Sequence, residues 1–221
     1  MGTIAVLNLA MIAVISSPPS FSNASQPIRG IVNPILAMEV VRNVREVDLV
    51  LSDAPSPDRE TMRIKQYADF GFIASYAALY IVMALTLAAY DQRTHVVAIA
   101  AAILGALAAI FDIIENLGIL RIVNVDLAHT TQAMIDAIRY PSLIKWFCAS
   151  LGLGLLGVLL IRARRTSIRI VGALELLAAL LGLCGVPKNA LLQWMQIPLL
   201  GGLVGLAILY FRPHWHRVRH T

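Results

Sequence analysis

Charged side chains are scarce in this sequence. Asp, Glu, Lys and Arg make up 14% of its 221 residues, whereas soluble globular proteins carry about 25%. This deficit, together with 58% hydrophobic residues and a mean hydropathy of +0.75, argues against an ordinary soluble domain. The composition indicates instead an integral membrane protein whose main solvent is lipid.

Cysteine is nearly absent, and no disulfide framework is predicted. Cys148 and Cys184 both fall inside apolar segments and have no CxxC spacing, so we interpret them as small core residues. The net charge of +5 does not indicate nucleic acid as a partner. The basic residues form small clusters beside apolar segments rather than one continuous soluble face.

Motifs for common chemistries are also missing. The sequence contains no HExxH, no GxSxG and no P-loop. No histidine falls in the interior of a predicted membrane span, His95 being the first residue of one, so no span offers an axial imidazole to haem, and we predict neither a cofactor nor a metal site. The five histidines lie in loops or in the C-terminal tail: His95, His129, His214, His216 and His220. An enzyme is not expected, although a carboxylate-dependent enzyme acting on lipid remains a third interpretation.

Long apolar segments dominate what the sequence does contain. Five approach the ~20 residues that cross the hydrocarbon layer, and a sixth is shorter. They predict an all-α polytopic bundle that forms a single membrane domain over residues 1–221. The predicted spans are 3–17, 67–90, 95–119, 141–161, 168–186 and 190–211. The first would reach only about 22 Å, and two interpretations stay open for it: a short anchor or a signal peptide.

Residues 17–65 form the largest polar region, and its central part predicts an amphipathic helix over 31–52. Apolar side chains recur there at helical spacing on one face: Leu36, Val40, Val44, Val47 and Leu51. Glu39 falls on the opposite, polar face. We expect this helix either to lie on the bilayer or to cap the bundle. Pro55 and Pro57 end the pattern, and a second, shorter surface helix is predicted at about 126–140.

The distribution of Lys and Arg predicts the orientation. Residues 91–95, 162–169 and 212–221 carry basic side chains at a higher density than the connections on the other side. Because cytoplasmic loops are enriched in Lys and Arg, we predict that both termini are cytoplasmic and that 17–65 is extracytoplasmic. The expected membrane is a plasma or inner membrane.

Several polar residues are predicted at one depth inside the bundle. Asp112 and Glu115 lie roughly 25–30 Å along the third span, and Lys145 enters the fourth span from the same side. A stripe of small residues that includes Gly105 continues to these acids on the third helix. Small residues allow close approach of neighbouring helices, so we expect the acids and the lysine to point into the bundle and meet.

The predicted ligand-binding set contains all polar residues expected at that level. It comprises Asp69, Asp112, Glu115, Asn116, Lys145 and Gln193. One interpretation is an outward-opening pocket for a small ligand, a lipid head group or an ion, with transport as an extension. The other is a buried ion-pair network that fixes helix register. The alternative function is a non-catalytic subunit of a larger membrane complex, with other membrane subunits as partners in addition to lipids.

Overall fold

The structure is a computed structural model that describes residues 2–22, 28–90 and 92–211. Over these ranges it is helical and contains no strand, which confirms the all-α prediction. The helices are α1 (Gly2–Ser16), α2 (Pro34–Glu39), α3 (Val44–Leu51), α4 (Pro57–Tyr90), η1 (Gln92–Thr94), α5 (His95–Val123), η2 (Leu127–His129), α6 (Gln132–Ile161), α7 (Thr166–Gly185) and α8 (Ala190–Phe211). Residues 212–221, which contribute to the predicted orientation, lie outside the described part.

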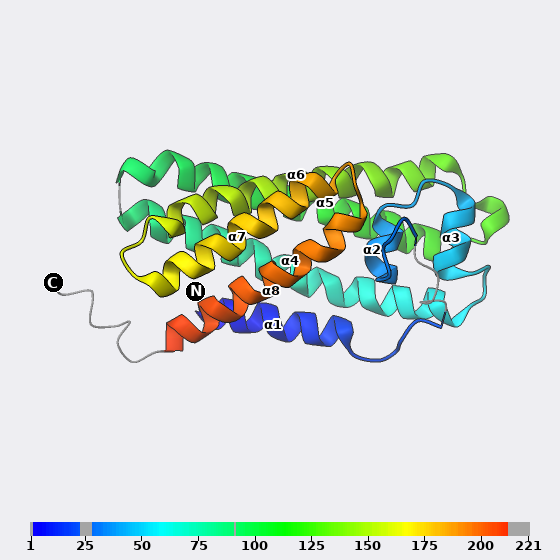
Figure 1. Ribbon diagram of the computed structural model, residues 1–221. Coiled ribbons are helices and arrows are strands. Elements are labelled where there is room, and N and C mark those ends of the chain that lie inside the picture. The colour runs from blue at the N-terminus through cyan, green and yellow to red at the C-terminus, as the bar shows by residue number, and fades with distance from the viewer. Residues whose placement is uncertain (1, 23–27, 91, 212–221) are drawn as a thin grey trace.

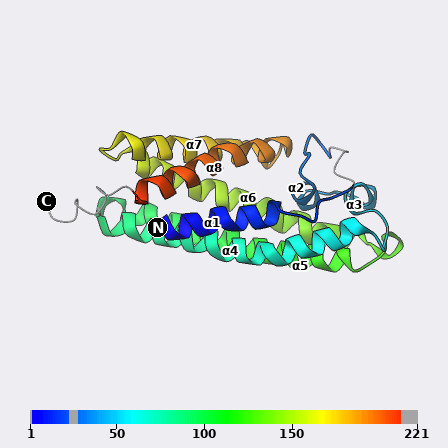
Figure 2. The same cartoon turned by 90° about the horizontal axis from the view of Figure 1, so that it is seen from below.

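Six helices form a closed ring in chain order. Each packs against the next, from α4 through α5, α6 and α7 to α8, and α1 closes the ring by contacting both α4 and α8. Both views show α1 lying along α4 (Figures 1 and 2). The centre of the ring is filled by buried apolar side chains from all five long helices, among them Met83, Leu156, Ala178 and Met195. The chain is therefore one helical bundle.

The long helices have the length and composition of membrane spans. Five of them, α4 to α8, contain apolar windows long enough to cross a bilayer, and α1 is a shorter apolar helix. Many large apolar side chains on their outer faces are exposed, including Leu107, Ile110, Leu117 and Ile197. Exposed aliphatic side chains at this density suit acyl chains rather than water. The protein is an integral membrane helical bundle.

Three of the predicted element boundaries are wrong. The helix that contains the second predicted span begins at Pro57 rather than 67, because the polar residues that follow Pro57 extend it beyond its apolar part. The predicted surface helix at 126–140 is divided between the short η2 and α6, and α6 starts at Gln132 and continues through Pro141 into the span predicted at 141–161. A proline inside a helix removes one hydrogen bond, and a packed neighbourhood tolerates that loss.

The third correction concerns the helix predicted over 31–52. The structure has two short helices there, α2 and α3, because Asn43 adopts an extended conformation and its side chain accepts a hydrogen bond from the Glu46 amide at 3.0 Å. This is a helix N-cap, and it starts α3 independently of α2. The apolar side chains of both helices cap the bundle, which was one of the two expected arrangements.

The α2–α3 segment fills a space that the longer helices leave. Helices α4, α5 and α6 have 34, 29 and 30 residues, whereas α7 and α8 have 20 and 22, so the first three project beyond the α7–α8 turn. Figure 1 shows α2 and α3 packed in that region, which we call the α2–α3 end. Leu36, Val47 and Leu51 are buried there against Ile119 and Ile135. This packing brings α2 to the predicted polar residues.

Candidate functional site

Lys145 on α6 lies at the centre of the predicted polar site. Its Nζ atom is 3.1 Å from Oδ1 of Asp112 and 2.8 Å from Oε2 of Glu115, both on α5. Asp112 and Glu115 are three residues apart, which places both carboxylates on one face of α5. The predicted meeting of these residues inside the bundle is found in the structure. Their role in binding a ligand stays a prediction.

A third carboxylate comes from outside the predicted set. Oε2 of Glu39, the last residue of α2, lies 3.1 Å from Nζ of Lys145. The same oxygen accepts a hydrogen bond of 2.7 Å from Nε1 of Trp146. The sequence prediction placed Glu39 on a polar outer face, which is wrong, because the break after α2 turns this residue into the bundle. We call Glu39, Asp112, Glu115 and Lys145 the acid–lysine cluster.

Trp146 also has a different role from the one its position suggested. A tryptophan near a span end is typical of an interfacial belt, but the Trp146 ring lies 4.9 Å from Nζ of Lys145 and is partly buried. A cation at this distance is attracted to the face of the ring. Trp146 therefore covers the ammonium while it holds Glu39.

The cluster is closed to solvent and contains more anions than cations. Glu39, Asp112, Glu115 and Lys145 are 7%, 5%, 1% and 5% exposed. If every group carried its ordinary charge, three negative charges would face one positive charge. Unbalanced buried charge is strongly unfavourable in an apolar interior, so the arrangement favours the presence of further positive charge.

Glu39 is the one member that lies outside the membrane-spanning helices. Burial raises the pKa of its carboxyl, the ammonium of Lys145 opposes that shift, and the neighbouring Asp112 carboxylate adds to it. Desolvation of the charged form is the largest of these effects. The Glu39 carboxyl is therefore a group that holds a proton more tightly than it would in water.

Two hydrogen bonds join α5 to α4 at this level. The hydroxyl of Tyr76 on α4 donates to Oδ2 of Asp112 at 2.9 Å. One turn along α5, Nδ2 of Asn116 donates to Oδ2 of Asp69, which is also on α4, at 2.8 Å. Asn116 is 1% exposed, and Asp69 is half-buried. The predicted residues Asp69 and Asn116 thus form a pair beside the cluster.

Gln193 on α8 makes a different contact from the one predicted. Its side-chain oxygen accepts a hydrogen bond of 2.7 Å from the amide of Val32 and one of 3.4 Å from the amide of Asn33. These residues immediately precede α2. Gln193 therefore fixes the start of the segment that carries Glu39 and does not enter the ion pairs.

Tyr80 lies one turn beyond Tyr76, deeper in the bundle. The two rings are 6.4 Å apart, and the Tyr80 hydroxyl donates to the carbonyl of Ala149 at 2.8 Å. The ring fits between Gly105 on α5 and Gly152 on α6, where a Cβ atom on either glycine would collide with it. The small-residue stripe predicted on the third span thus provides space for an aromatic side chain.

Glu175 is a second buried acid, near the middle of α7. It is 2% exposed, and its Oε2 atom has no hydrogen-bond partner among the described residues. Its carboxyl packs directly against Gly202 on α8, where a Cβ atom would collide with it. No Lys, Arg or His in the described part of the chain lies within ion-pair distance of it. An ionised carboxylate is costly to bury in such surroundings without a paired cation.

The acids converge on the lysine rather than on a common empty point. In the part of the chain that the structure describes, no group of three or more His, Cys, Asp and Glu side chains is arranged to hold a metal ion. Comparison with protein-family models, with curated proteins and with solved structures finds no match to this chain.

Proposed function

We propose that the acid–lysine cluster binds a small cation, in the first place a proton, and that the protein moves this cation across the membrane. One observation carries the proposal: three buried carboxylates surround a single buried ammonium. Intramembrane ionisable groups are expensive to bury and are characteristic of ion and proton pathways.

The contacts of Lys145 favour a cationic ligand over an anionic one. A lysine ammonium has three hydrogens, and three carboxylates share them, so no donor is left for an incoming anion. The carboxylates, in contrast, have spare acceptor capacity. A cation satisfies them and reduces the excess negative charge at the same time.

A proton is the cation that fits the closed arrangement. The four residues are at most 7% exposed, and each carboxylate already lies about 3 Å from the ammonium of Lys145, so a larger ion would have to displace that ammonium. A proton needs only one carboxylate oxygen. If a larger cation is transported, the ammonium of Lys145 would compete with it for the three carboxylates and would move away from them when the cation binds.

Further polar groups mark a route away from the cluster. Tyr76 contacts Asp112, Tyr80 lies next to Tyr76, and Glu175 is buried near the middle of α7. Tyrosine hydroxyls and carboxyls both donate and accept protons. These residues are the ones we expect to carry protons between the α2–α3 end and the centre of the bundle.

For the orientation, we infer that the α2–α3 end faces away from the cytoplasm and that both termini are cytoplasmic. The opposite end contains Arg93, Arg162, Arg164 and Arg165 in its two short connections and Arg169 in the first turn of α7. Dense basic residues in short loops favour the cytoplasmic side. Single cysteines at Arg164 and at Asp48, in a Cys184→Ser background, should react with an impermeant maleimide from the cytoplasmic and the opposite side, respectively; the reverse pattern would overturn this inference.

Transport can be tested with purified protein in liposomes that contain a pH-sensitive dye. An inside-acid gradient is imposed, and Na⁺ or K⁺ is added outside. We expect wild-type protein to dissipate the gradient when one of these cations is added, because a proton that leaves the vesicle by way of the cluster is exchanged for an entering cation and no net charge crosses the membrane. Glu115→Gln should slow this response at least tenfold, a loss that corresponds to about 1.4 kcal/mol of barrier.

The matched control is Glu60→Gln, which removes an exposed acid at the same end and should leave the rate unchanged. A wild-type rate equal to that of protein-free liposomes with every cation would contradict transport. If the wild type transports and Glu115→Gln keeps the full rate, the cluster is not the site, and the ion pairs only fix helix register.

A further inference from the structure

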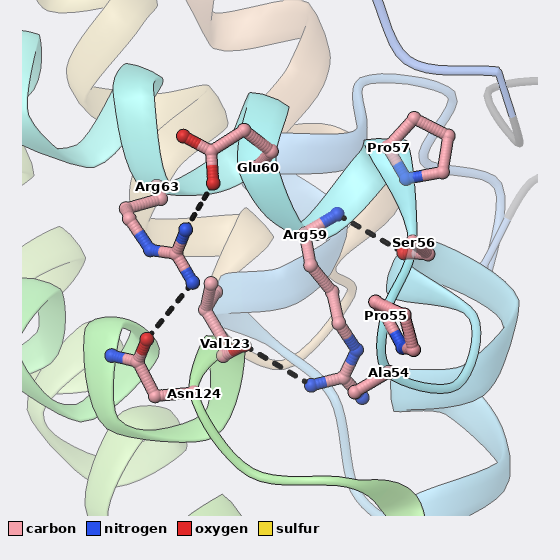
Figure 3. Close-up of a pocket in the computed structure, with 9 residues that line it drawn as sticks. All are labelled: Ala54, Pro55, Ser56, Pro57, Arg59, Glu60, Arg63, Val123 and Asn124. Carbon is pink, nitrogen blue, oxygen red and sulfur yellow. Dashed lines mark hydrogen bonds and ion pairs between the residues drawn. The ribbon is translucent and has the colours of Figure 1, made fainter.

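An open pocket lies at the α2–α3 end, away from the acid–lysine cluster. It has a volume of about 530 Å³ and lies between the loop that precedes α4 and the C-terminal end of α5. Figure 3 shows Arg59 and Arg63 reaching into it from the first two turns of α4, with Ala54 and Pro55 on one side and Asn124 on the other. We call it the Arg59–Arg63 pocket.

Arg59 is a buried cation that no carboxylate of the described residues contacts directly, although Asp53, Asp126 and Asp48 act on its guanidinium from a longer distance. It is 3% exposed, and no carboxylate of the described residues lies within ion-pair distance of its guanidinium. Its Nε donates to the carbonyl of Ser52 at 2.9 Å and its Nη1 to that of Ile122 at 2.8 Å. Nη2 has no hydrogen-bond partner among the described residues. A buried donor without a hydrogen-bond partner destabilises the fold, the more so when it is charged, and an anion in the pocket would satisfy it.

Arg63 adds a second guanidinium on the same face, one helical turn along α4. Its side chain is 32% exposed, and it pairs with Glu60 and with the Asn124 side-chain oxygen, the latter at 2.9 Å. Solvent-exposed ion pairs of this kind contribute little to stability, so an anion that binds Arg63 more strongly can replace Glu60 as its partner. The N-terminal end of α4 adds a partial positive charge from its peptide dipoles.

The charge of the lining suits a phosphodiester. Arg59 and Arg63 contribute two positive charges and Glu60 one negative charge, which leaves a net charge of +1. A phosphodiester carries one negative charge, and guanidinium groups bind phosphate oxygens with two donors at a time.

Neighbouring residues place the pocket at the level of lipid head groups. Tyr67, four residues after Arg63 on α4, is 63% exposed, and Ile64 beside it is 44% exposed. Tyrosine is enriched where the hydrocarbon layer meets water, and one turn of helix rises about 5–6 Å. The two arginines thus lie just outside the aromatic level, with an exposed apolar surface directly below them for an acyl chain.

We propose that the Arg59–Arg63 pocket binds the phosphodiester of a membrane lipid, with Arg63 and Nη2 of Arg59 as the donors to phosphate and Tyr67 and Ile64 in contact with the acyl chains. This site is independent of the cation proposed for the acid–lysine cluster. Lipid bound here would fix the loop before α4 to the end of α5.

The test measures binding of dioleoyl phosphatidylglycerol to purified protein in detergent by native mass spectrometry. Arg63→Gln should weaken binding roughly tenfold, as expected for the loss of one charge-assisted pair to phosphate. Arg63→Lys keeps the charge and should lose less. The matched control is Arg121→Gln, which removes one exposed positive charge at the same end without touching the pocket, and should bind like wild type.

Two further ligands separate the sources of the phosphate. Dioleoylglycerol, which has acyl chains and no phosphate, should bind at least tenfold more weakly than the phospholipid. Inorganic phosphate at the same concentration should not displace the bound phospholipid. If Arg63→Gln and Arg121→Gln weaken phospholipid binding equally, the loss reflects the total positive charge of the protein, and the proposed site is wrong. If dioleoylglycerol binds as tightly as the phospholipid, the pocket does not recognise the phosphate. If inorganic phosphate displaces the phospholipid, the pocket binds free phosphate and not a lipid.

Discussion

The ammonium of Lys145 on α6 lies 2.8 Å from Oε2 and 3.0 Å from Oε1 of Glu115 on α5, and both residues are nearly inaccessible to solvent. The pair joins the two helices at the depth where α2 caps the bundle. Because two further carboxylates share the same ammonium, the charges at this point are unequal, and the two partners should respond differently to mutation.

Replacement of the cation should have the larger effect. Lys145→Met leaves three buried acids without a cation, and we expect a loss of about 3–5 kcal/mol in the free energy of unfolding at neutral pH. Denaturant or thermal unfolding in detergent would measure it. Lys188→Met, which removes an exposed lysine at the same end, is the control and should change stability little. Equal small losses for both variants would mean that the cluster is hydrated.

Replacement of one acid should be tolerated. Glu115→Gln keeps a hydrogen-bond acceptor for Lys145 and reduces the excess negative charge, so we expect a loss of no more than about 1 kcal/mol. In the double variant Lys145→Met/Glu115→Gln, the second change should recover part of the loss caused by the first. A double-mutant cycle measures this coupling, and purely additive losses would contradict the shared charge balance.

Stability should depend on pH through Glu39. Burial raises the pKa of this carboxyl above its ordinary value of 4.5, so the folded protein binds the proton more tightly than the unfolded chain does. This contribution is complete below pH 4.5 and is lost as the pH rises through the raised folded-state pKa. Glu39→Gln should remove that part of the pH dependence in an unfolding series, whereas Glu60→Gln should preserve it. A Glu39→Gln profile parallel to that of wild type would contradict the assignment.

Two adjacent glycines on α8 should differ sharply when changed to alanine. A Cβ at Gly202 collides with the Glu175 carboxyl, whereas a Cβ at Gly201 makes only ordinary contacts with Leu174. We expect Gly202→Ala to destabilise the protein by about 1–3 kcal/mol through overpacking. Gly201→Ala should be neutral or slightly stabilising, because alanine favours a helix.

The Gly202 effect has its own internal check. In a Glu175→Ala background the carboxyl is gone, and Gly202→Ala should then cost much less than in wild type. If Gly202→Ala lowers the free energy of unfolding equally in both backgrounds, the glycine is needed for close packing of α7 against α8 and not to make room for the Glu175 carboxyl. Thermal unfolding of the four proteins in one detergent is sufficient for this comparison.

The helices and the meeting of Asp112 with Lys145 could be predicted from the sequence. Long apolar segments define spans without regard to tertiary contacts, and a constant rise per residue places polar groups at a common depth. The stripe that contains Gly105 then indicated which face of α5 turns inward. These inferences depend on local geometry that lipid-embedded helices rarely violate.

Glu39 could not be placed in the same way. Its position depends on the end of α2 and on packing against helices more than a hundred residues away, and a helical period does not encode either of these. One signal was present: Glu39 is the only charged residue in the apolar run from Ile35 to Val41. A single charge in such a run is better explained by a buried partner than by a solvated face.

The most direct test is infrared difference spectroscopy of the protein in lipid nanodiscs during a pH titration. Because burial raises the pKa of Glu39, we expect a band from a protonated carboxyl group that persists above the ordinary carboxyl pKa of 4.5, disappears at alkaline pH and loses amplitude in Glu39→Gln, while Glu60→Gln leaves it unchanged. A spectrum in which no protonated carboxyl above that pH depends on Glu39 would contradict the claim that the acid–lysine cluster takes up protons.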